Sequence, residues 1–300
     1  MKFSKDKKEH DNVKVCVIGL GTVGLPTAQY CLDRGLKVYG YDIDPNAVNK
    51  AKTFGIFANT RWNEIPSVDA YIICVSTILR GESPDLLPIF DVCEKIANKD
   101  HSSPLVSIES TIIPGTSRKI YNEIFKRNVK LVHVPHRYWA GDSVKHGVKQ
   151  LRVIGAICDE SLEAGLKFYQ DVLKIPLHIV KSIEVAEMSK ITENACRYVQ
   201  IAFAEELKMI CGELGLDFEE VRKACNTKWN IEILEARGGI DGHCLPKDVR
   251  YLMSLSDANV LLASAVRADE EYRKWLARQV KRKKRTKPKI LISNRKDCWV

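Results

Sequence analysis

One cysteine of the chain lies in a setting suited to covalent chemistry. Cys244 stands in the run GGIDGHCLPKD at positions 238–248, where the glycines leave its sulfur approachable. His243 and Lys247 are cationic or potentially cationic neighbours, and they favour the thiolate, which is the form that attacks a carbonyl carbon. The alternative is a small buried hydrophobic residue, the common role of a free cysteine. The spacing alone leaves both interpretations open.

A second candidate group is the pair Lys190 and Asn194, four residues apart in a stretch with helical periodicity. Residues at i and i+4 share one face of a helix, so an ammonium and an amide there could jointly hold an oxyanion or a water molecule. The alternative is an ordinary solvated helix face.

The sequence GLGTVG at 19–24 predicts a dinucleotide site. It follows the apolar run 13–18 and opens a helical stretch, and Asp42 ends the next β-rich run eighteen residues after Gly24. The glycines allow a tight turn, close approach of a pyrophosphate and close helix packing, while the acid binds ribose hydroxyls. Because a carboxylate repels a 2′-phosphate and residues 43–46 contain no arginine, NAD is preferred to NADP.

These residues need a scaffold of alternating strands and helices. Further strands are expected at 69–75, 105–109, 130–134, 151–156 and 177–180. This pattern predicts an α/β fold, a Rossmann-like doubly wound parallel sheet followed by a long helix and a small all-helical domain. The long helix is expected from Ser182 for about thirty residues, with shorter ones at 217–226 and 257–280. The expected domains are a charged leader at 1–12, an NAD-binding domain at 13–181, a helical central or dimerisation domain at 182–280 and a basic tail at 281–300.

Composition and charge exclude several classes of protein. The chain has 300 residues, 45% hydrophobic and 28% charged, which is typical of a globular protein. It contains no apolar run near the ~20 residues of a membrane span, and its charged N-terminus lacks a secretory signal, so we expect a cytoplasmic location. The net charge is +9, but residues 273–300 hold twelve Lys or Arg against Asp297, leaving 9 − 11 = −2 for the rest. The ten cysteines include no Cys-x-x-Cys, so we expect no metal site, and mostly buried, reduced thiols.

Several separated motifs resemble the UDP-glucose/GDP-mannose dehydrogenase family, over residues 13 to about 275. STIIPGT at 110–116 looks like the family's Ser-Thr-x-x-Pro-Gly-Thr, and AEMSKITEN at 186–194 looks like its helical Lys/Asn motif. The cysteine run resembles its catalytic loop. The Gly-His-Cys start is similar to the UDP-N-acetylmannosamine dehydrogenase branch, whereas Pro-Lys-Asp is closer to the UDP-glucose and GDP-mannose branches.

The resemblance implies a four-electron oxidation of a nucleotide-sugar C6 alcohol to a carboxylate, through a cysteine thiohemiacetal and a thioester, with reduction of two NAD. Transferred by motif, Cys244 is the nucleophile, Lys190 and Asn194 stabilise the oxyanion, and Thr111 and Asp248 position or activate water. The implied cofactor-binding residues are Gly19, Gly21, Thr22, Val23, Gly24, Asp42, Val75, Ser76, Thr77, Ser110 and Thr111. The implied substrate-binding residues are Arg137, Lys190, Asn194, Arg197, Gly239 and Lys247.

The sequence departs from the family pattern at three places. His136 stands where the family has a glutamate linked to thioester hydrolysis, and it is interpreted either as a substitute general base or as a non-catalytic surface residue. Asp241 interrupts the glycine pair before His243, and a carboxylate so close opposes thiolate formation unless it is paired. Finally, only residues 289–293 resemble the start of the family's C-terminal nucleotide-binding domain.

Three other functions are weighed against this one. A β-hydroxyacid-type dehydrogenase shares the Lys/Asn helix but makes one hydride transfer without a cysteine. A catalytically impaired NAD-binding homologue could have an assembly or regulatory role. Nucleic-acid binding through the basic tail is not expected, because a solvated linker explains that segment. The expected partners are a nucleotide sugar, most simply a UDP-sugar, and a second copy of the chain, bound through the long helix as a homodimer.

Overall fold

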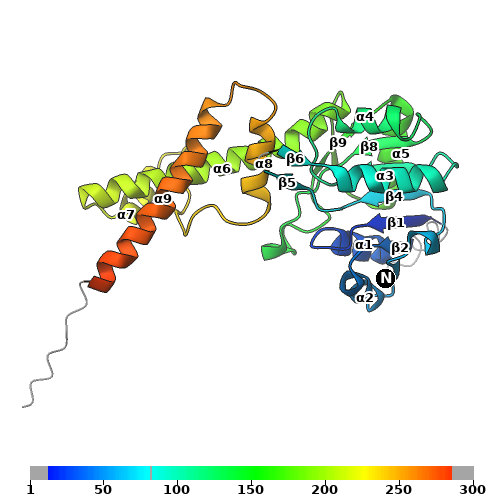
Figure 1. Ribbon diagram of the computed structural model, residues 1–300, viewed down its shortest axis with the longest axis horizontal. Helices are drawn as coiled ribbons and strands as arrows, with labels where there is room; N and C mark the ends of the chain where they lie inside the picture. Colours follow the sequence, from blue (N-terminus) through cyan, green and yellow to red (C-terminus); the bar gives the residue numbers. More distant parts are fainter. Residues whose placement is uncertain (1–12, 82, 286–300) are drawn as a thin grey trace, which may run out of the picture. The chain divides into compact units, whose positions relative to one another are not determined.

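A computed structural model describes residues 13–81 and 83–285 of the chain (Figure 1). Its centre is an eight-stranded sheet in the order β10-β9-β8-β7-β4-β1-β2-β3. The strands are β1 Lys14–Ile18, β2 Lys37–Tyr41, β3 Phe57–Asn59, β4 Ala70–Ile73, β7 Leu105–Ile108, β8 Lys130–His133, β9 Arg152–Ala156 and β10 Leu177–Ile179. Neighbouring strands are parallel except for the antiparallel pair β8 and β9. The α/β fold class and the mostly parallel sheet are confirmed.

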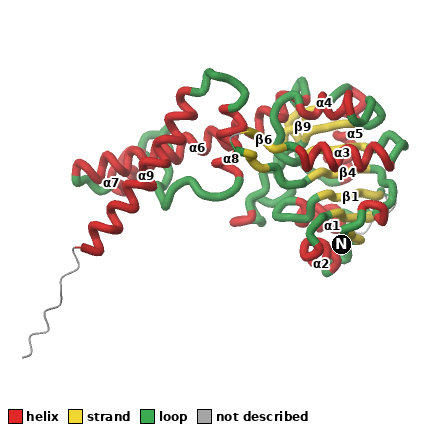
Figure 2. The backbone as a smooth tube through the Cα atoms, viewed as in Figure 1, coloured by secondary structure: helices red, strands yellow, loops and turns green. Residues whose placement is uncertain are grey.

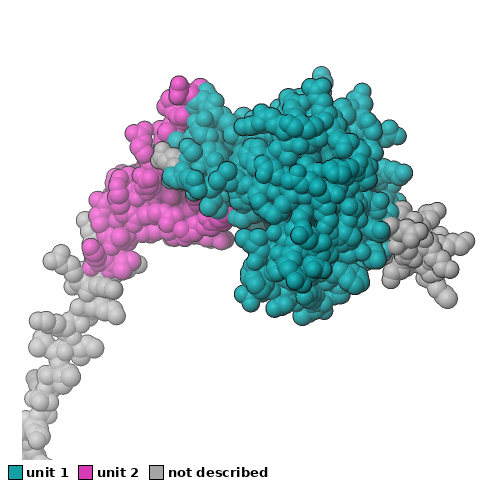
Figure 3. Space-filling view, turned by 45° about the vertical axis from the view of Figure 1, so that its right-hand side comes forward, with its two compact units in different colours: residues 1–194, 247–256 teal, residues 195–246, 257–300 magenta. Residues whose placement is uncertain are grey.

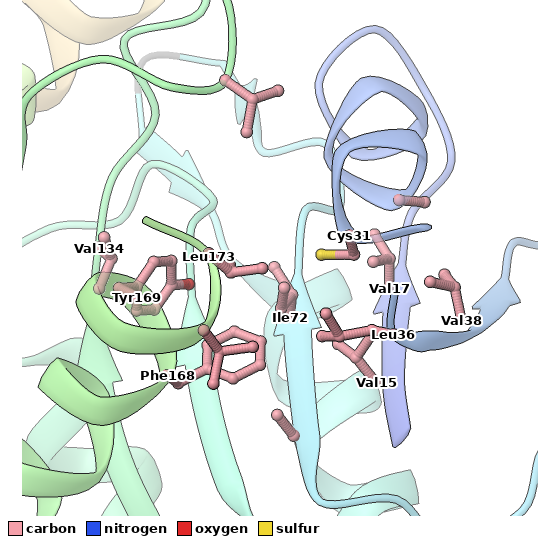
Figure 4. Packing of buried hydrophobic residues seen from close by; sticks show 14 of the residues in the cluster. Val15, Val17, Cys31, Leu36, Val38, Ile72, Val134, Phe168, Tyr169 and Leu173 are labelled. Carbon is pink, nitrogen blue, oxygen red and sulfur yellow. The ribbon is translucent and has the colours of Figure 1, made fainter. Parts of the chain in front are cut away.

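Helices cover both faces of this sheet. They are α1 Gly24–Asp33, α2 Pro45–Lys52, α3 Leu87–Lys99, α4 Thr116–Glu123 and α5 Asp159–Leu166, which continues as a π-helix over Lys167–Val172. One core cluster joins Val15 and Val17 of β1 to α1, α2 and the π-helix (Figure 4). The other joins Cys16 and Ile18 to α3 and α4. Because successive side chains of a strand point to opposite faces, β1 is buried on both of them, as a doubly wound fold requires.

Two short elements were not expected from the sequence. The edge strand β3 has three residues, and an antiparallel hairpin follows β4, made by β5 Ile78–Arg80 and β6 Ser83–Asp85. Three residues are too few to show the alternation that identifies a strand. Both elements flank loops at the carboxyl edge of the sheet.

Four helices follow the sheet: α6 Ile183–Leu214, α7 Phe218–Cys225, α8 Cys244–Met253 and α9 Val260–Arg285 (Figure 2). The predicted long helix is confirmed by the 32 residues of α6. Cys244 is the first residue of α8 and directly follows the glycine-containing segment 238–243. The helix expected over 257–280 extends to Arg285 and so includes the basic run 281–285.

The chain forms two compact units that divide within α6 and α8 (Figure 3). Unit 1 comprises residues 1–194 and 247–256, and unit 2 comprises 195–246 and 257–300. The core of unit 2 is a small cluster made by α6, α7, α9 and the segment between α7 and α8. Its buried members are Ala204, Cys211, Phe218, Ile233, Ala236 and Tyr272.

The expectation that most cysteines are buried is wrong for the described part of the chain. Four are buried, Cys74 is partly buried, and Cys158, Cys196, Cys225 and Cys244 are exposed. Exposure alone therefore does not distinguish Cys244. The charged leader 1–12 and the residues 289–293 lie outside the described residues. None of the described helices is long and apolar enough to cross a membrane.

The junction between β9 and the start of α6 predicts a strict requirement for glycine at position 155. A Cβ there would lie 2.7 Å from the Ser182 carbonyl oxygen and 2.8 Å from Ala186 Cβ. We expect Gly155→Ala to lower the free energy of unfolding by about 1–3 kcal/mol through overpacking. Gly238→Ala is the control, because no atom lies within 4 Å of its added Cβ. Urea unfolding measures both variants, and equal stability of the two would contradict the prediction.

Candidate functional site

The glycine turn between β1 and α1 forms an open cradle of backbone. Gly19 has a φ of 87°, and a Cβ at Gly24 would lie 1.7 Å from the Gly19 carbonyl oxygen, so larger residues would break the turn. At Gly21 an added Cβ would meet no atom within 4 Å. The backbone there is open to a ligand, and the α1 N-terminus that follows provides a positive dipole for a phosphate. These features fit the pyrophosphate of a dinucleotide.

Asp42 follows β2 and its carboxylate is tied to this turn. Oδ2 accepts a hydrogen bond from the Leu20 backbone N–H at 2.6 Å, and Oδ1 accepts one from the Asp44 N–H at 2.9 Å. The carboxylate is therefore oriented beside the glycine turn, at the position where the expected ribose hydroxyls would lie. Thr22 and Val23 occupy the last part of the turn before α1.

The loops after β4 and β7 are joined by side-chain hydrogen bonds. The Ser110 hydroxyl lies 2.7 Å from the Val75 carbonyl oxygen, and the Thr77 hydroxyl donates to the Thr111 carbonyl oxygen at 2.9 Å. Thr77 is 4% exposed, whereas its neighbour Ser76 is exposed to solvent. Parallel strands end at the same edge, so these residues and the glycine turn face one side of the sheet.

A buried ionic network lies beneath these loops. Glu109 directly follows β7, and its side chain is fully buried. Its Oε1 accepts from the Arg152 guanidinium at 3.0 Å and from the Tyr169 hydroxyl at 2.5 Å. Its Oε2 lies 2.5 Å from His136 Nε2, which is also 2.9 Å from the Thr27 hydroxyl of α1. The network thus connects α1, β7, β9 and the loop after β8.

The network keeps one member charged and another neutral. Burial alone would raise the pKa of Glu109, but His136, Arg152 and the Tyr169 hydroxyl outweigh burial and lower the pKa to about 2. Burial, assisted by Arg152, lowers the pKa of His136 to about 4 although Glu109 acts in the opposite direction. The alternative interpretation of His136 as a surface residue is therefore wrong, because the residue is 6% exposed and bound to a buried acid.

Cys74, Glu109 and His136 also have the donor atoms of a metal site, all within 4.8 Å of one another. However, Arg152 already neutralises Glu109, and the Cys74 thiol lies 3.6 Å from Glu109 Oε2 as a hydrogen-bond donor. Burial, followed by the charge of Glu109, raises the pKa of Cys74 well above its usual value, which disfavours the thiolate that a metal binds. A buried ion pair explains this cluster without a metal.

A second polar cluster of unit 1 is built by α6 and α8. Asp248 is fully buried; its Oδ2 accepts from the Asn194 amide at 2.5 Å and its Oδ1 pairs with the Lys247 ammonium. Lys247 is 6% exposed and lies 3.5 Å from the Thr77 hydroxyl and 4.1 Å from the centre of the Tyr251 ring. The structure therefore brings together four of the residues that the resemblance implies: Thr77 from the loop after β4, Asn194 from α6, and Lys247 and Asp248 from α8.

Two other implied residues lie near α6 in unit 1. Lys190 is partly buried, one helical turn before Asn194. Arg137 forms hydrogen bonds to Glu193, its Nε lying 3.1 Å from both carboxylate oxygens, and its Nη1 donates to the Leu151 carbonyl oxygen at 2.9 Å. Arg137 thus has a protein partner in addition to any role with a substrate.

The remaining implied residues belong to unit 2. Cys244 and Arg197 are exposed, and Gly239 lies with its Cα against the Arg273 guanidinium, at a φ of 109°. Asp241, whose charge opposes a thiolate nearby, is paired with Arg273 at 3.0 Å. From the sequence, Asp241 was expected to oppose a Cys244 thiolate unless it was paired, and the structure shows that it is paired.

Sequence reasoning missed the residues that hold these groups in place. They are Glu109, Arg152, Tyr169, Glu193, Tyr251, Asp269 and Arg273. Only Glu109 carried a signal, because an acid at the end of a buried apolar strand requires a partner. The partner, 43 residues along the chain, has no local pattern that identifies it.

Comparisons with known proteins identify the family of the chain. Residues 55–173 match the NAD binding domain of the UDP-glucose/GDP-mannose dehydrogenase family, and residues 184–272 match its central domain. The UDP-N-acetyl-D-mannosamine dehydrogenase of Methanococcus aeolicus is 31% identical over 92% of this chain and 68% of its own length. That of Methanococcus vannielii is 32% identical over 87% and 66%, so the chain spans about two thirds of each relative. The structure of UDP-D-ManNAc dehydrogenase from Pyrococcus horikoshii is similar with a TM-score of 0.82, at 28% identity, over 90% of this chain and 71% of that one.

Burial of His133 predicts that the free energy of unfolding falls in mild acid. His133 is fully buried, and burial lowers its pKa to about 3 although a backbone hydrogen bond with Ile108 acts in the opposite direction. Between pH 6.5 and 3 the unfolded chain binds a proton that the folded chain excludes, so stability is present above pH 6.5 and falls with pH by up to about 1.4 kcal/mol per unit. We expect His133→Leu to reduce the slope of unfolding free energy against pH. Exposed His101→Asn is the control, and an unchanged slope in His133→Leu would contradict the prediction.

Proposed function

The chain belongs to the UDP-glucose/GDP-mannose dehydrogenase family, and we propose that it oxidises the C6 alcohol of a UDP-sugar to a carboxylate with NAD. The overall reaction consumes one water and two NAD, and releases two NADH and three protons. The observation that carries the proposal is the cluster of Asn194, Lys247 and Asp248 beside Thr77. It places an amide, an ammonium and a carboxylate next to the loop of the dinucleotide-binding edge.

We propose UDP-N-acetylmannosamine as the sugar. The two relatives cited above carry that specificity in their names and are 31% and 32% identical to this chain. The Gly-His-Cys sequence at 242–244 supports the same branch. UDP-glucose is the second candidate, supported by the Pro-Lys-Asp sequence at 246–248.

NAD, when bound, accepts a hydride from the sugar carbon in each of the two oxidation steps. The residues proposed to hold it are the glycine turn for the pyrophosphate, Asp42 for a ribose, and the loops containing Val75 and Ser110 at the far end. The fit rests on the open backbone at Gly21 and on the fixed orientation of the Asp42 carboxylate. A carboxylate bound to the Leu20 amide would repel a 2′-phosphate, which supports NAD rather than NADP.

The proposed roles of the reacting groups follow from their charges. Lys190 is the cation that stabilises the alcohol oxygen when the alcohol loses its proton, and Asn194 is a second hydrogen-bond donor to that oxygen. Asp248 fixes the Asn194 amide and the Lys247 ammonium, so these two donors keep one orientation through both steps. Cys244, which is exposed, adds to the aldehyde to form the thiohemiacetal, and water positioned by Thr111 and Asp248 hydrolyses the later thioester.

We propose that His136 is a positioning residue rather than the base for hydrolysis. Its Nε2 is engaged by Glu109 and Thr27, and Nδ1 is buried without a partner among the described residues. Thr27 belongs to the helix after the glycine turn, and Glu109 precedes Ser110. His136 therefore ties the two loops of the proposed cofactor site together.

A single-step β-hydroxyacid dehydrogenase is the weaker alternative. Such an enzyme would use the Lys/Asn helix but has no need of a cysteine. An NAD-binding homologue without turnover is a third possibility, which the following experiment separates from the other two.

The proposed function predicts a cysteine-dependent stoichiometry. With UDP-N-acetylmannosamine, UDP-glucose, UDP-N-acetylglucosamine or GDP-mannose as substrates, we expect two NADH per sugar, measured at 340 nm, with the N-acetylmannosamine compound preferred. Cys244→Ala should lose acid formation by at least about 10³-fold, since the covalent route is removed. Cys225→Ala, another exposed cysteine, is the control. One NADH per sugar with an active Cys244→Ala would instead support the single-step alternative, and NAD binding without turnover would support the impaired homologue.

We also propose that the chain forms a homodimer through α6. Phe203, Ile210 and Leu214 are 56%, 47% and 68% exposed, and their spacing places them on one face of the helix. Three large exposed apolar side chains in one row are typical of an interface. Sedimentation should show a dimer that Phe203→Glu dissociates and that Lys223→Glu, on α7, leaves intact. A monomeric wild-type chain at micromolar concentration would contradict this proposal.

A further inference from the structure

Glu205 on α6 is a buried acid for which the proposed function has no use. It is 0% exposed, and neither carboxylate oxygen accepts a hydrogen bond from any described residue. An ionised carboxylate without donors is very costly inside a protein, whereas a protonated one can donate its own hydrogen. The environment therefore favours the protonated form.

The neighbouring carboxyl group, Asp269 on α9, is in hydrogen-bond contact with Glu205 and can accept that proton. Asp269 is 6% exposed and, unlike Glu205, has several donors. The Ile240 backbone N–H donates to its Oδ1 at 2.9 Å, and Arg273 Nε lies 3.1 Å from both oxygens. The Tyr198 hydroxyl lies 3.3 Å from Oδ2. Asp269 therefore has the donors that stabilise a carboxylate, whereas Glu205 has none.

The same two residues of α9 hold the segment that leads to Cys244. Besides the Asp269 bond to Ile240, Arg273 Nη1 pairs with Asp241 at 3.0 Å. The Arg273 guanidinium also covers Gly239, where an added Cβ would lie 2.7 Å from Cζ. Three consecutive residues ahead of the cysteine loop, 239–241, are therefore fixed by α9 within unit 2.

We propose that Glu205, Asp269 and Arg273 are positioning residues for Cys244, in which a proton shared by the two carboxyl groups keeps Asp269 bound to the Ile240 amide. This inference rests on the proposed role of Cys244 as the nucleophile. When Glu205 loses the proton, two adjacent negative charges repel each other, and the bond from Ile240 to Asp269 weakens. The segment 239–241 then becomes mobile and no longer holds the sulfur in one orientation.

The charges around Glu205 determine the pH at which this occurs. Burial is the main cause that raises the pKa of Glu205 to about 8; Asp269 and Asp241 raise it further, and Arg273 opposes them. Burial and the charge of Glu205 in turn raise the pKa of Tyr272, the neighbouring phenol on α9, to about 12, and the Tyr198 hydroxyl of α6 also faces Asp269. Between pH 7 and 9 Glu205 is therefore the group expected to change its charge.

Glu205→Gln tests the proposal, because glutamine imitates the protonated acid and cannot ionise. Hydrogen exchange of the peptide containing Ile240 is measured by mass spectrometry at pH 7 and pH 9 in the full chain. The variants are compared with one another at the same pH, so that the intrinsic pH dependence of amide exchange cancels. Glu206→Gln, the adjacent exposed acid on the same helix, is the control. The rate of Cys244 alkylation by iodoacetamide, relative to exposed Cys158 and Cys225 in the same sample, provides a second readout.

At pH 9 we expect the wild type and Glu206→Gln to exchange the Ile240 amide about tenfold faster than Glu205→Gln, the effect of losing one hydrogen bond. At pH 7 the three should agree. The relative alkylation rate of Cys244 should change between pH 7 and 9 in the wild type and stay constant in Glu205→Gln. Equal exchange of all three proteins at pH 9 would overturn the proposal.

Asp269→Asn provides an independent test if Glu205→Gln fails to fold. Asparagine still accepts from the Ile240 amide through its carbonyl oxygen and donates to an ionised Glu205, so the protection should again persist at pH 9. Loss of protection in that variant at both pH values would contradict the shared proton. Neither readout needs sugar or NAD, so a chain that shows this pH dependence without producing NADH would refute the proposed function and leave the positioning role intact.

Discussion

The carboxylate of Glu109 is the constraint on which the dinucleotide edge of the sheet depends. A charge at the end of a buried strand has no water to stabilise it, so the protein must supply donors from several directions. Arg152 comes from β9, Tyr169 from the π-helix after α5, and His136 from the loop after β8. Each of these donors fixes the element that carries it. Removal of one partner would leave a buried charge, which is far more costly than the loss of a surface ion pair.

The position of this charge explains why distant loops keep one arrangement. Glu109 immediately precedes Ser110 and Thr111, whose contacts with Val75 and Thr77 join the loops after β4 and β7. Through His136 and Thr27 the same charge is linked to the helix behind the glycine turn. Thr77 continues the chain of contacts to Lys247, and Lys247 to Asp248 and Asn194. A continuous series of contacts thus links the buried carboxylate of Glu109 to both polar clusters of unit 1.

The sequence was sufficient for the architecture because its signals are local. The β-α-β unit with its glycines, the apolar strands and the long periodic run of α6 each lie within one continuous stretch, and each was found close to its observed bounds. The motifs also named Asn194, Lys247 and Asp248, which the structure brings into contact. The three-residue strands β3, β5 and β6 were missed because a period of two cannot be seen in three residues. The pairings of Glu109 with Arg152 and of Asp241 with Arg273 are separated by 43 and 32 residues, and no local pattern encodes them.

Asp241 illustrates why a charge near a reactive residue cannot be judged from the sequence alone. Its carboxylate lies three residues before Cys244, and taken alone it opposes a thiolate. In the folded chain Arg273 faces Asp241 and Asp269 together, so the cation that neutralises the first is held in place by the second. Asp269 and Glu205 together carry a single negative charge, because Glu205 lies in surroundings that favour its neutral form. The charge distribution around the cysteine loop therefore depends on whether the buried acid Glu205 is protonated. In the same way, the arrangement of the dinucleotide edge depends on the ionised form of Glu109.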